Sequence, residues 1–233
     1  MTFEKKFYLG SKNKLKKFNE NLNFQNLFQP NRDDIFNSNF KFKGRWNDYF
    51  ENSNPITLEL GCGKGEYSFE LAKKYHNRNF IGIDIKGARI WTGAKKSTNL
   101  KMKNICFIRT NIDLIGNLFS DSEIDEIWIT FPDPQIKIQR KKHRLINEFY
   151  LGLYKRILKK DGVIHLKTDS EFLHGYTLGL IESNEIELIH SNHDIYSNNN
   201  APIDALKIQT FYENQYLKEN KKITYLSFKF IYE

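Results

Sequence analysis

Short apolar runs rich in Ile, Leu and Phe alternate along this chain with longer stretches in which apolar residues recur at helical spacing. Each run predicts a strand, and each stretch between two runs predicts a helix. The predicted strands cover residues 56–60, 79–84, 104–108, 124–130, 163–168, 186–190 and 223–231. The predicted helices cover residues 66–75, 88–99, 144–158 and 171–182, with a short helical piece after residue 113.

This alternation indicates an α/β fold, in which helices cover both faces of a mostly parallel sheet. We see no internal repeat, and the one obvious long loop is the Asn-rich stretch 192–201. The pattern therefore predicts a single domain with a substantial core over residues 31–233. Residues 1–30 are rich in lysine and contain no long apolar run, and we expect a flexible basic arm there. Its lysines are Lys5, Lys6, Lys12, Lys14, Lys16 and Lys17.

The first predicted strand stops at three glycines on alternate positions, Gly61, Gly63 and Gly65, and a predicted helix follows from Glu66. A strand, a tight turn and a helix start form the arrangement in which backbone can approach a nucleotide-like ligand. Glycine suits this turn because a Cβ would hinder both a positive φ angle and the approach of the ligand. The turn therefore predicts a binding site for a ligand of this kind.

The spacing of the glycines argues against a dinucleotide. A dinucleotide turn reads Gly-x-Gly-x-x-Gly, whereas here the third glycine comes one residue early and Glu66 stands in its place. A carboxylate at the start of a helix disfavours a pyrophosphate there. A cationic ligand with a ribose diol suits the site better, and S-adenosylmethionine has this chemistry.

Two acids and an amide stand where such a ligand needs polar partners. Glu59, at the end of the first predicted strand, can face the positive end of the ligand. Asp84 ends the second predicted strand and is placed to accept hydrogen bonds from two ribose hydroxyls. Asn111 follows the third predicted strand and can hydrogen-bond the adenine region. The sequence thus predicts S-adenosylmethionine as the cofactor.

A second informative stretch begins where strand 124–130 runs into Phe131-Pro132-Asp133-Pro134. The two prolines fix the backbone on either side of Asp133 and so pre-position its carboxylate. A basic run follows in the same loop, formed by Lys137, Arg140, Lys141, Lys142, His143 and Arg144. In an open parallel sheet this loop faces the same crevice as the glycine turn. An acid beside a basic run suggests a cleft for a base on a phosphate backbone.

Composition narrows the class of protein further. A net charge of +8 and a pI near 9.2 point toward a polyanionic partner such as nucleic acid. No apolar run approaches the ~18 residues of a membrane span, so we expect no membrane partner. Cys62 and Cys106 are too few for a disulfide framework and fit a cytoplasmic protein. The six histidines lack the spacing of metal ligands, and we expect no metal site.

With these motifs the chain resembles the class I S-adenosylmethionine-dependent methyltransferases. The stretch from Glu59 to Gly65 is similar to their first motif, and Gly82-Ile83-Asp84 is similar to their second. Within that class the chain resembles the bacterial tRNA (guanine-N(7)-)-methyltransferases. Their signature is similar to three separated stretches here, which are Phe131 to Pro134 with Lys137, Thr168-Asp169, and Thr210-Phe211-Tyr212-Glu213.

The resemblance implies a Rossmann-like sheet of seven strands with an antiparallel last strand. It also implies methyl transfer from S-adenosylmethionine to N(7) of a guanosine in tRNA, at position 46 of the variable loop. The sequence leaves open whether the protein is a monomer or a homodimer. The family's catalytic Asp falls on Asp133. Its cofactor positions fall on Glu59, Asp84, Asn111 and Asp133, and its substrate positions on Lys137, Asp169 and residues 210–213.

One departure from the family pattern concerns the loop beside Asp133. The family commonly has Trp-Pro where this chain has Gln135-Ile136, which leaves the detailed shape of the loop open. Two other functions stay open as well. One is a class I methyltransferase that acts on another RNA, a protein or a small molecule, and the other is a non-catalytic RNA-binding module.

Overall fold

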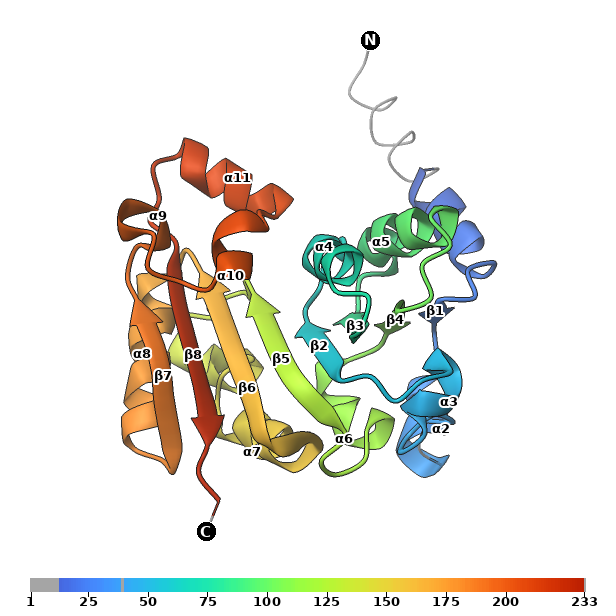
Figure 1. Cartoon of the computed structure of the whole chain (residues 1–233), viewed down its shortest axis with the longest axis horizontal. Helices are drawn as coiled ribbons and strands as arrows, with labels where there is room; N and C mark the ends of the chain where they lie inside the picture. The colour runs from blue at the N-terminus through green and yellow to red at the C-terminus, as the bar shows by residue number, and fades with distance from the viewer. Residues whose placement is uncertain (1–12, 39, 233) are drawn as a thin grey trace.

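A computed structural model describes residues 13–38 and 40–232 of the chain (Figure 1). Within these residues, eight strands form one sheet in the order β1-β4-β3-β2-β5-β6-β8-β7. In chain order the strands are β1 (Leu27–Phe28), β2 (Ile56–Leu60), β3 (Asn79–Asp84), β4 (Ile105–Arg109), β5 (Ile124–Thr130), β6 (Leu158–Thr168), β7 (Ile186–Asn192) and β8 (Thr224–Phe230). Strand β8 is antiparallel to both β6 and β7, and the other described pairs are parallel, which confirms the predicted α/β sheet with an antiparallel last strand.

Helices cover both faces of the sheet, as predicted. One face carries α2 (Arg32–Ser38), α3 (Trp46–Phe50), η1 (Ile112–Leu114), α6 (Ile115–Leu118), α7 (Glu148–Ile157) and α8 (Glu171–Glu182). The other carries α4 (Glu66–Lys74), α5 (Gly87–Asn99), α9 (Ile195–Asn198), α10 (Ile203–Lys207) and α11 (Phe211–Lys218). A 3-10 segment, η2 (Ile138–His143), lies in the loop after β5. Over residues 13–38 and 40–232, none of the helices combines the length and the apolar character that a membrane crossing requires.

The observed elements follow the predicted ones closely, with a few shifted ends. Strands β2, β3 and β5 have the predicted bounds. The helix predicted over 144–158 begins only at Glu148, because Asn147 Oδ1 caps it by accepting a hydrogen bond from Tyr150 N at 3.0 Å. The loop predicted at 192–201 contains the short helix α9.

Strand β6 begins earlier than predicted, at Leu158. Leu158 pairs with Ile124, whereas Val163 already pairs with Glu126, so the residues between Leu158 and Val163 form a bulge. Asp161 and Gly162 lie in this bulge, so they interrupt the pairing with β5 without ending β6.

The arm expected at residues 1–30 is folded from residue 13 onward. Residues 13–21 are helical, and β1 adds an eighth strand beside β4, where seven strands were expected. Asn21 Nδ2 donates to the backbone of α5 at 2.9 Å, and Asn26 Nδ2 donates to Ser97 Oγ at 2.7 Å. Leu27 and Phe28 add apolar contacts with the two cores, but two residues are too short a run to predict a strand. Three of the lysines of the expected arm, Lys5, Lys6 and Lys12, lie outside the described residues.

The two faces of the sheet differ in chemistry. The face that packs on α6, α7 and α8 is apolar, and its strand residues, such as Leu58, Ile127 and Leu166, are fully buried. The face that packs on α4, α10 and α11 also buries charged side chains, above all Glu59 on β2 and Lys167 on β6. Because a buried charge without partners is costly, the helices on this face must supply hydrogen bonds to the strands.

The turn between β2 and α4 has the geometry that its glycines predict. Gly61, Gly63 and Gly65 have φ angles of 74°, 55° and 68°, in the left-handed region that disfavours a Cβ. At Gly65 an added Cβ would also overlap the ring of Phe107 on β4. Gly65 therefore serves the packing of the turn against the sheet.

We expect Gly65→Ala to lower the free energy of unfolding by about 2 kcal/mol or more, because the new methyl group meets both backbone strain and the Phe107 ring. The matched control is Gly152→Ala in α7, where nothing lies within 4 Å of an added Cβ. That variant should be about 0.5–1 kcal/mol more stable, since alanine favours a helix interior. Urea unfolding measures both values, and equal stability of the two variants would contradict the role of Gly65.

Candidate active site at the carboxyl edge of the sheet

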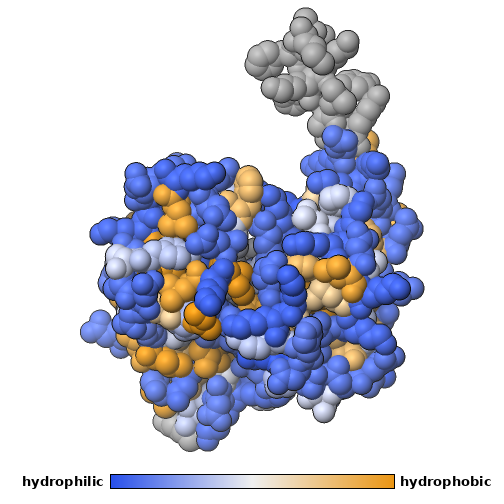
Figure 2. All heavy atoms as spheres, turned by 45° about the horizontal axis from the view of Figure 1, so that its top comes forward, coloured by the Kyte–Doolittle hydropathy of each residue, from blue (hydrophilic) through white to orange (hydrophobic). Residues whose placement is uncertain are grey.

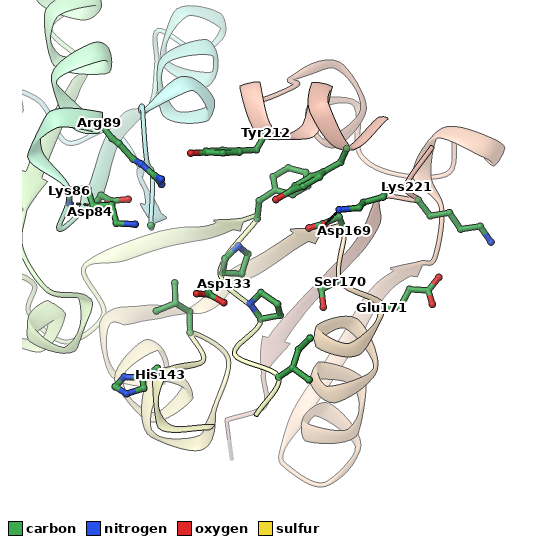
Figure 3. A pocket seen from close by; sticks show the side chains of 18 of the residues that line it. Asp84, Lys86, Arg89, Asp133, His143, Asp169, Ser170, Glu171, Tyr212 and Lys221 are labelled. Carbon is green, nitrogen blue, oxygen red and sulfur yellow. Dashed lines mark hydrogen bonds and ion pairs between the residues drawn. The ribbon is translucent and has the colours of Figure 1, made fainter. Parts of the chain in front are cut away.

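A cleft of about 1050 Å³ opens at the carboxyl ends of the central strands (Figure 3). Asp84 at the end of β3, Asp133 after β5 and Asp169 after β6 all line it. These acids converge because parallel strands end at the same edge of a sheet. The face that carries these strand ends is mainly hydrophilic (Figure 2). The structure thus brings together the three acids that the sequence singled out.

The glycine turn is held against the end of β3. The backbone N–H groups of Gly61 and Cys62 both donate to Ile83 O, at 2.8 and 3.0 Å. Gly63 N donates to Asp84 Oδ2 at 2.9 Å, and Lys86 N donates to Asp84 Oδ1 at 2.7 Å. A carboxylate has about four acceptor positions, so Asp84 can still accept hydrogen bonds from a ligand in the cleft.

A smaller cavity of about 430 Å³ adjoins the cleft on the side of β4. Gly61 and Asp84 line both spaces, and Asn111 lines the smaller one together with Thr110 and Ile112. The predicted positions of the glycine turn, the ribose acceptor and the adenine partner are therefore contiguous. They form a pocket with an apolar wall and a few convergent polar groups, as small-molecule sites usually do.

Glu59 does not face the cleft, contrary to the expectation that it meets a ligand's positive end. It is 2% exposed and lies beneath the glycine turn. Its Oε2 accepts hydrogen bonds from both Ser68 N and Ser68 Oγ, and its Oε1 accepts from Thr130 Oγ1 at 3.0 Å. The carboxyl group thus joins the first turn of α4 to β2 and β5 and is shielded from the cleft, which makes Glu59 a residue that positions the turn.

The loop around Asp133 is strained on both sides of that residue. Phe131 and Gln135 have φ angles of 49° and 48°, which non-glycine residues rarely adopt. Asp133 is exposed in the cleft, and its Oδ1 accepts from Gln135 N at 3.3 Å. Strained backbone of this kind persists where surrounding structure enforces it, and it concentrates at functional sites. The loop is shaped to present Asp133.

Arg144 is one of the groups that enforce this shape. Its Nε donates to Gln135 O at 3.1 Å, and one terminal nitrogen donates to Ile136 O at 3.2 Å. The guanidinium also lies 4.5 Å from the ring centroid of Tyr176 and is 4% exposed. The expectation that Arg144 contacts phosphate is therefore wrong, because the side chain is buried beneath the loop that it holds. The bond from Arg140 Nε to Gln135 Oε1, at 2.5 Å, holds the same loop.

Of the other basic residues of the run, His143 lines the cleft, and the three lysines lie on the surface beside it. Lys137, Lys141 and Lys142 are exposed, and η2 carries the last two. Lys141 Nζ pairs with Glu148 at 3.0 Å. These lysines remain available to a polyanion, but they do not reach the lining formed by the three acids.

The stretch from Thr210 to Glu213 has a structural task that the sequence prediction did not include. Thr210 caps α11 and forms a capping box with Glu213. Glu213 is completely buried, and its Oε1 lies 2.6 Å from Lys167 Nζ and accepts from Tyr196 OH at 2.7 Å. The expectation that Thr210 and Glu213 contact the substrate is corrected accordingly, since both are engaged in anchoring α11.

Tyr212 is the residue of this stretch that reaches the cleft (Figure 3). Tyr216, one helical turn further on, lines the cleft too, and its ring centroid lies 5.8 Å from that of Phe131. The ring of Phe211 turns aside and packs under Lys64 Nζ at 3.5 Å. Phe131, Tyr212 and Tyr216 thus form an aromatic wall opposite the side of the cleft that holds Asp84.

Comparison with known proteins identifies the family. A family model described as "Putative methyltransferase" matches residues 53–226. A tRNA (guanine-N(7)-)-methyltransferase of Christiangramia forsetii is 56% identical over 222 residues, which make up 95% of this chain and 99% of that protein. The protein of the same name from Bacteroides thetaiotaomicron is 42% identical, and the match covers 94% of this chain and 86% of that protein. This chain belongs to the tRNA (guanine-N(7)-)-methyltransferase family.

Solved structures confirm the Rossmann-like fold of class I methyltransferases. The 16S rRNA methyltransferase KamB matches with a TM-score of 0.60 at 10% identity, over 80% of this chain and 93% of that one. A 30S ribosomal A1408 methyltransferase from an uncultured bacterium matches with a TM-score of 0.59 at 18% identity, over 81% and 93%. At these identities the likeness concerns the fold alone.

Several residues that line the cleft were missed in the sequence, among them Arg89, Tyr216 and Lys221. Tyr216 follows Tyr212 at the i, i+4 spacing of one helix face, and this signal could have found it. Lys221 Nζ lies 3.6 Å from Asp169 and 4.4 Å from the Tyr216 ring centroid. Arg89 and Lys221 belong to none of the family motifs quoted above, so their placement emerged only from the fold.

The buried Glu59 gives the stability of this family member a defined pH dependence. Burial raises the pKa of Glu59 to about 7 from 4.5. The folded protein then holds a proton that the unfolded chain releases between pH 4.5 and 7. The stability that Glu59 contributes should therefore fall as pH rises through this window, by about 3 kcal/mol in all.

Urea unfolding of the wild type and Glu59→Gln at about pH 5 and about pH 8 tests this prediction. The glutamine keeps the shape of the side chain but cannot titrate. The wild type should lose stability relative to Glu59→Gln at the higher pH. A stability difference that is the same at both pH values would refute the coupling.

Proposed function

We propose that this protein transfers the methyl group of S-adenosylmethionine to N(7) of a guanosine in tRNA, at position 46 of the variable loop. The observation that carries the proposal is the 56% identity to a tRNA (guanine-N(7)-)-methyltransferase over nearly the full length of both chains. The cleft supports it. The smaller cavity on the β4 side can hold a nucleoside, and the aromatic wall, Asp133 and Asp169 line the adjoining cleft. A tRNA substrate also implies the cytoplasm, which suits the two free buried thiols.

The residues on the β3 side fit S-adenosylmethionine. Asp84 retains acceptor positions for the ribose hydroxyls, and Asn111 in the adjoining cavity would serve the adenine. A Cβ added at Gly63 would find no atom closer than 4.0 Å, so the turn leaves room for a ligand against the backbone at this residue. When bound there, S-adenosylmethionine supplies a methyl group activated by its sulfonium.

The residues on the α11 side fit a purine on a phosphate backbone. Tyr212 and Tyr216 offer faces on which a base stacks, and such stacking contributes roughly 1–3 kcal/mol per base. The exposed lysines of η2 and Lys137 would contact phosphates on the rim. These contacts offset the unstacking of the guanine from the folded tRNA, which costs a few kcal/mol.

The reaction is a matter of positioning. N(7) of guanine carries an in-plane lone pair and needs no deprotonation, so no general base and no metal is required. Asp133 would orient the guanine by accepting from its ring N–H or its amino group. The negative charge of Asp133 also favours the positive charge that develops on the purine as N(7) gains the methyl group. Asp169 lines the same cleft and would share this electrostatic role.

Incubation with labelled S-adenosylmethionine and unmodified tRNA tests the proposal. We expect label in the tRNA, and borohydride–aniline treatment, which cuts at 7-methylguanosine, should cleave the product in the variable loop. Label elsewhere in tRNA, in another RNA or in a small molecule would favour the other methyltransferase functions. Binding of tRNA without any transfer would favour the non-catalytic module.

The variant Asp133→Asn should lower turnover by at least ~10-fold while binding of S-adenosylmethionine stays close to the wild type, because the charge acts on the acceptor. Asp161→Asn, an exposed acid in the β6 bulge, is the matched control and should turn over normally. Single-turnover kinetics and equilibrium binding separate the two effects. Near-normal turnover of Asp133→Asn would rule out its proposed role.

A further inference from the structure

Arg89 projects into the cleft without a carboxylate to pair with. Its guanidinium lines the large cleft and also a small cavity of about 60 Å³ beside the glycine turn. Across residues 13–38 and 40–232, no acid lies within ion-pair distance of it. Its contact is with Tyr212, whose ring centroid lies 5.4 Å from the guanidinium carbon. A half-buried guanidinium that stacks on one ring keeps its hydrogen-bond donors free.

The place of Arg89 in its helix adds to the positive potential. Arg89 stands in the first turn of α5, a helix of 13 residues with no acid in that turn. The amino end of a helix is already positive, so a cation there is unfavourable unless an anion binds nearby. The sequence tolerates an arginine at a position where an aspartate or glutamate would stabilise the helix. This points to an anionic ligand on the Arg89 side of the cleft.

The small cavity holds groups of both charges. The glycine turn forms part of its lining, and Glu66 and Arg89 contribute a carboxylate and a guanidinium. Glu66 Oε2 accepts from Phe211 N at 3.0 Å, which leaves its other oxygen open to a ligand. A cavity of this size suits the head group of an amino acid, which carries an ammonium and a carboxylate on one carbon.

The cavities also fix which end of the cofactor would lie here. Gly61 lines the large cleft, the adenine-side cavity and the small cavity, so these spaces meet at the glycine turn. Asn111 lines the cavity of about 430 Å³, and Arg89 lines the cavity of about 60 Å³. A ligand with its adenine near Asn111 and its sulfonium near Gly61 would therefore extend its amino-acid end toward Arg89.

We propose that Arg89 binds the carboxylate of the methionine part of S-adenosylmethionine, with Glu66 facing its ammonium. The assignment rests on the proposed function only for the identity of the cofactor. Arginine suits the task because its planar fork pairs with both oxygens of a carboxylate. The same fork would also bind a phosphate of tRNA, so the experiment must separate these two anions.

Equilibrium binding to the full-length protein, without tRNA, tests the proposal. The probes are S-adenosylmethionine, its decarboxylated form, and 5′-methylthioadenosine, which lacks the amino-acid end. The wild type should bind S-adenosylmethionine about 10-fold or more tighter than the decarboxylated form, as expected for a charged hydrogen bond. Arg89→Met should lose this preference while its affinity for 5′-methylthioadenosine stays unchanged. Arg89→Lys should fall between, and Arg45→Met, at an exposed arginine, is the control.

Three results would overturn the proposal. One is that Arg89→Met still prefers S-adenosylmethionine over its decarboxylated form as strongly as the wild type does. Another is an equal loss of affinity for all three probes, which would show that Arg89 only shapes the pocket. The third is normal donor binding by Arg89→Met together with weaker binding of tRNA in a separate titration without any donor, which would assign Arg89 to a phosphate. These measurements need no methyl transfer, so they stand apart from a failure of the proposed function.

Discussion

Two ionisable side chains, Glu59 on β2 and Lys167 on β6, point to the same face of the sheet, and both are buried. Burying a charge costs several kcal/mol unless hydrogen bonds and a counter-charge compensate. Glu59 finds its donors in the first turn of α4 and on β5. Lys167 finds Glu213 on α11 at 2.6 Å and the carbonyl of Ile208 at 3.0 Å. The helices on this face must therefore dock in one arrangement.

That arrangement builds the two sides of the cleft. The bonds of Glu59 fix the start of α4 and with it the glycine turn, which forms the cofactor side of the proposed site. The bond between Lys167 and Glu213 fixes the start of α11 and with it Tyr212, the residue directly before Glu213. Burial lowers the pKa of Lys167, while the charge of Glu213 opposes this shift and favours the ammonium form. The site thus depends on buried ionisable groups that do not line the cleft.

Much of the fold could be predicted from the sequence, because strand and helix periodicity are local properties. The pattern predicted β2, β3 and β5 with their bounds, and the glycine turn with its positive φ angles. It failed where polar contacts decide the structure. Asn21 and Asn26 dock the segment before β1, and Asn147 shortens α7, although none of these residues is part of an apolar pattern.

The sequence by itself determined the order of the elements, the family and the acids that meet at the strand ends, since parallel strands bring Asp84, Asp133 and Asp169 to one edge. Only the tertiary structure decided which polar residues of a motif face the cleft and which serve the core. Glu59, Arg144 and Glu213 belong to the quoted motifs or the basic run beside them but are buried, whereas Arg89 and Tyr216 lie outside the motifs and line the cleft. The physical reason is that burial and hydrogen-bond partners arise from contacts between segments far apart in the chain. The type and spacing of neighbouring residues do not by themselves reveal these contacts.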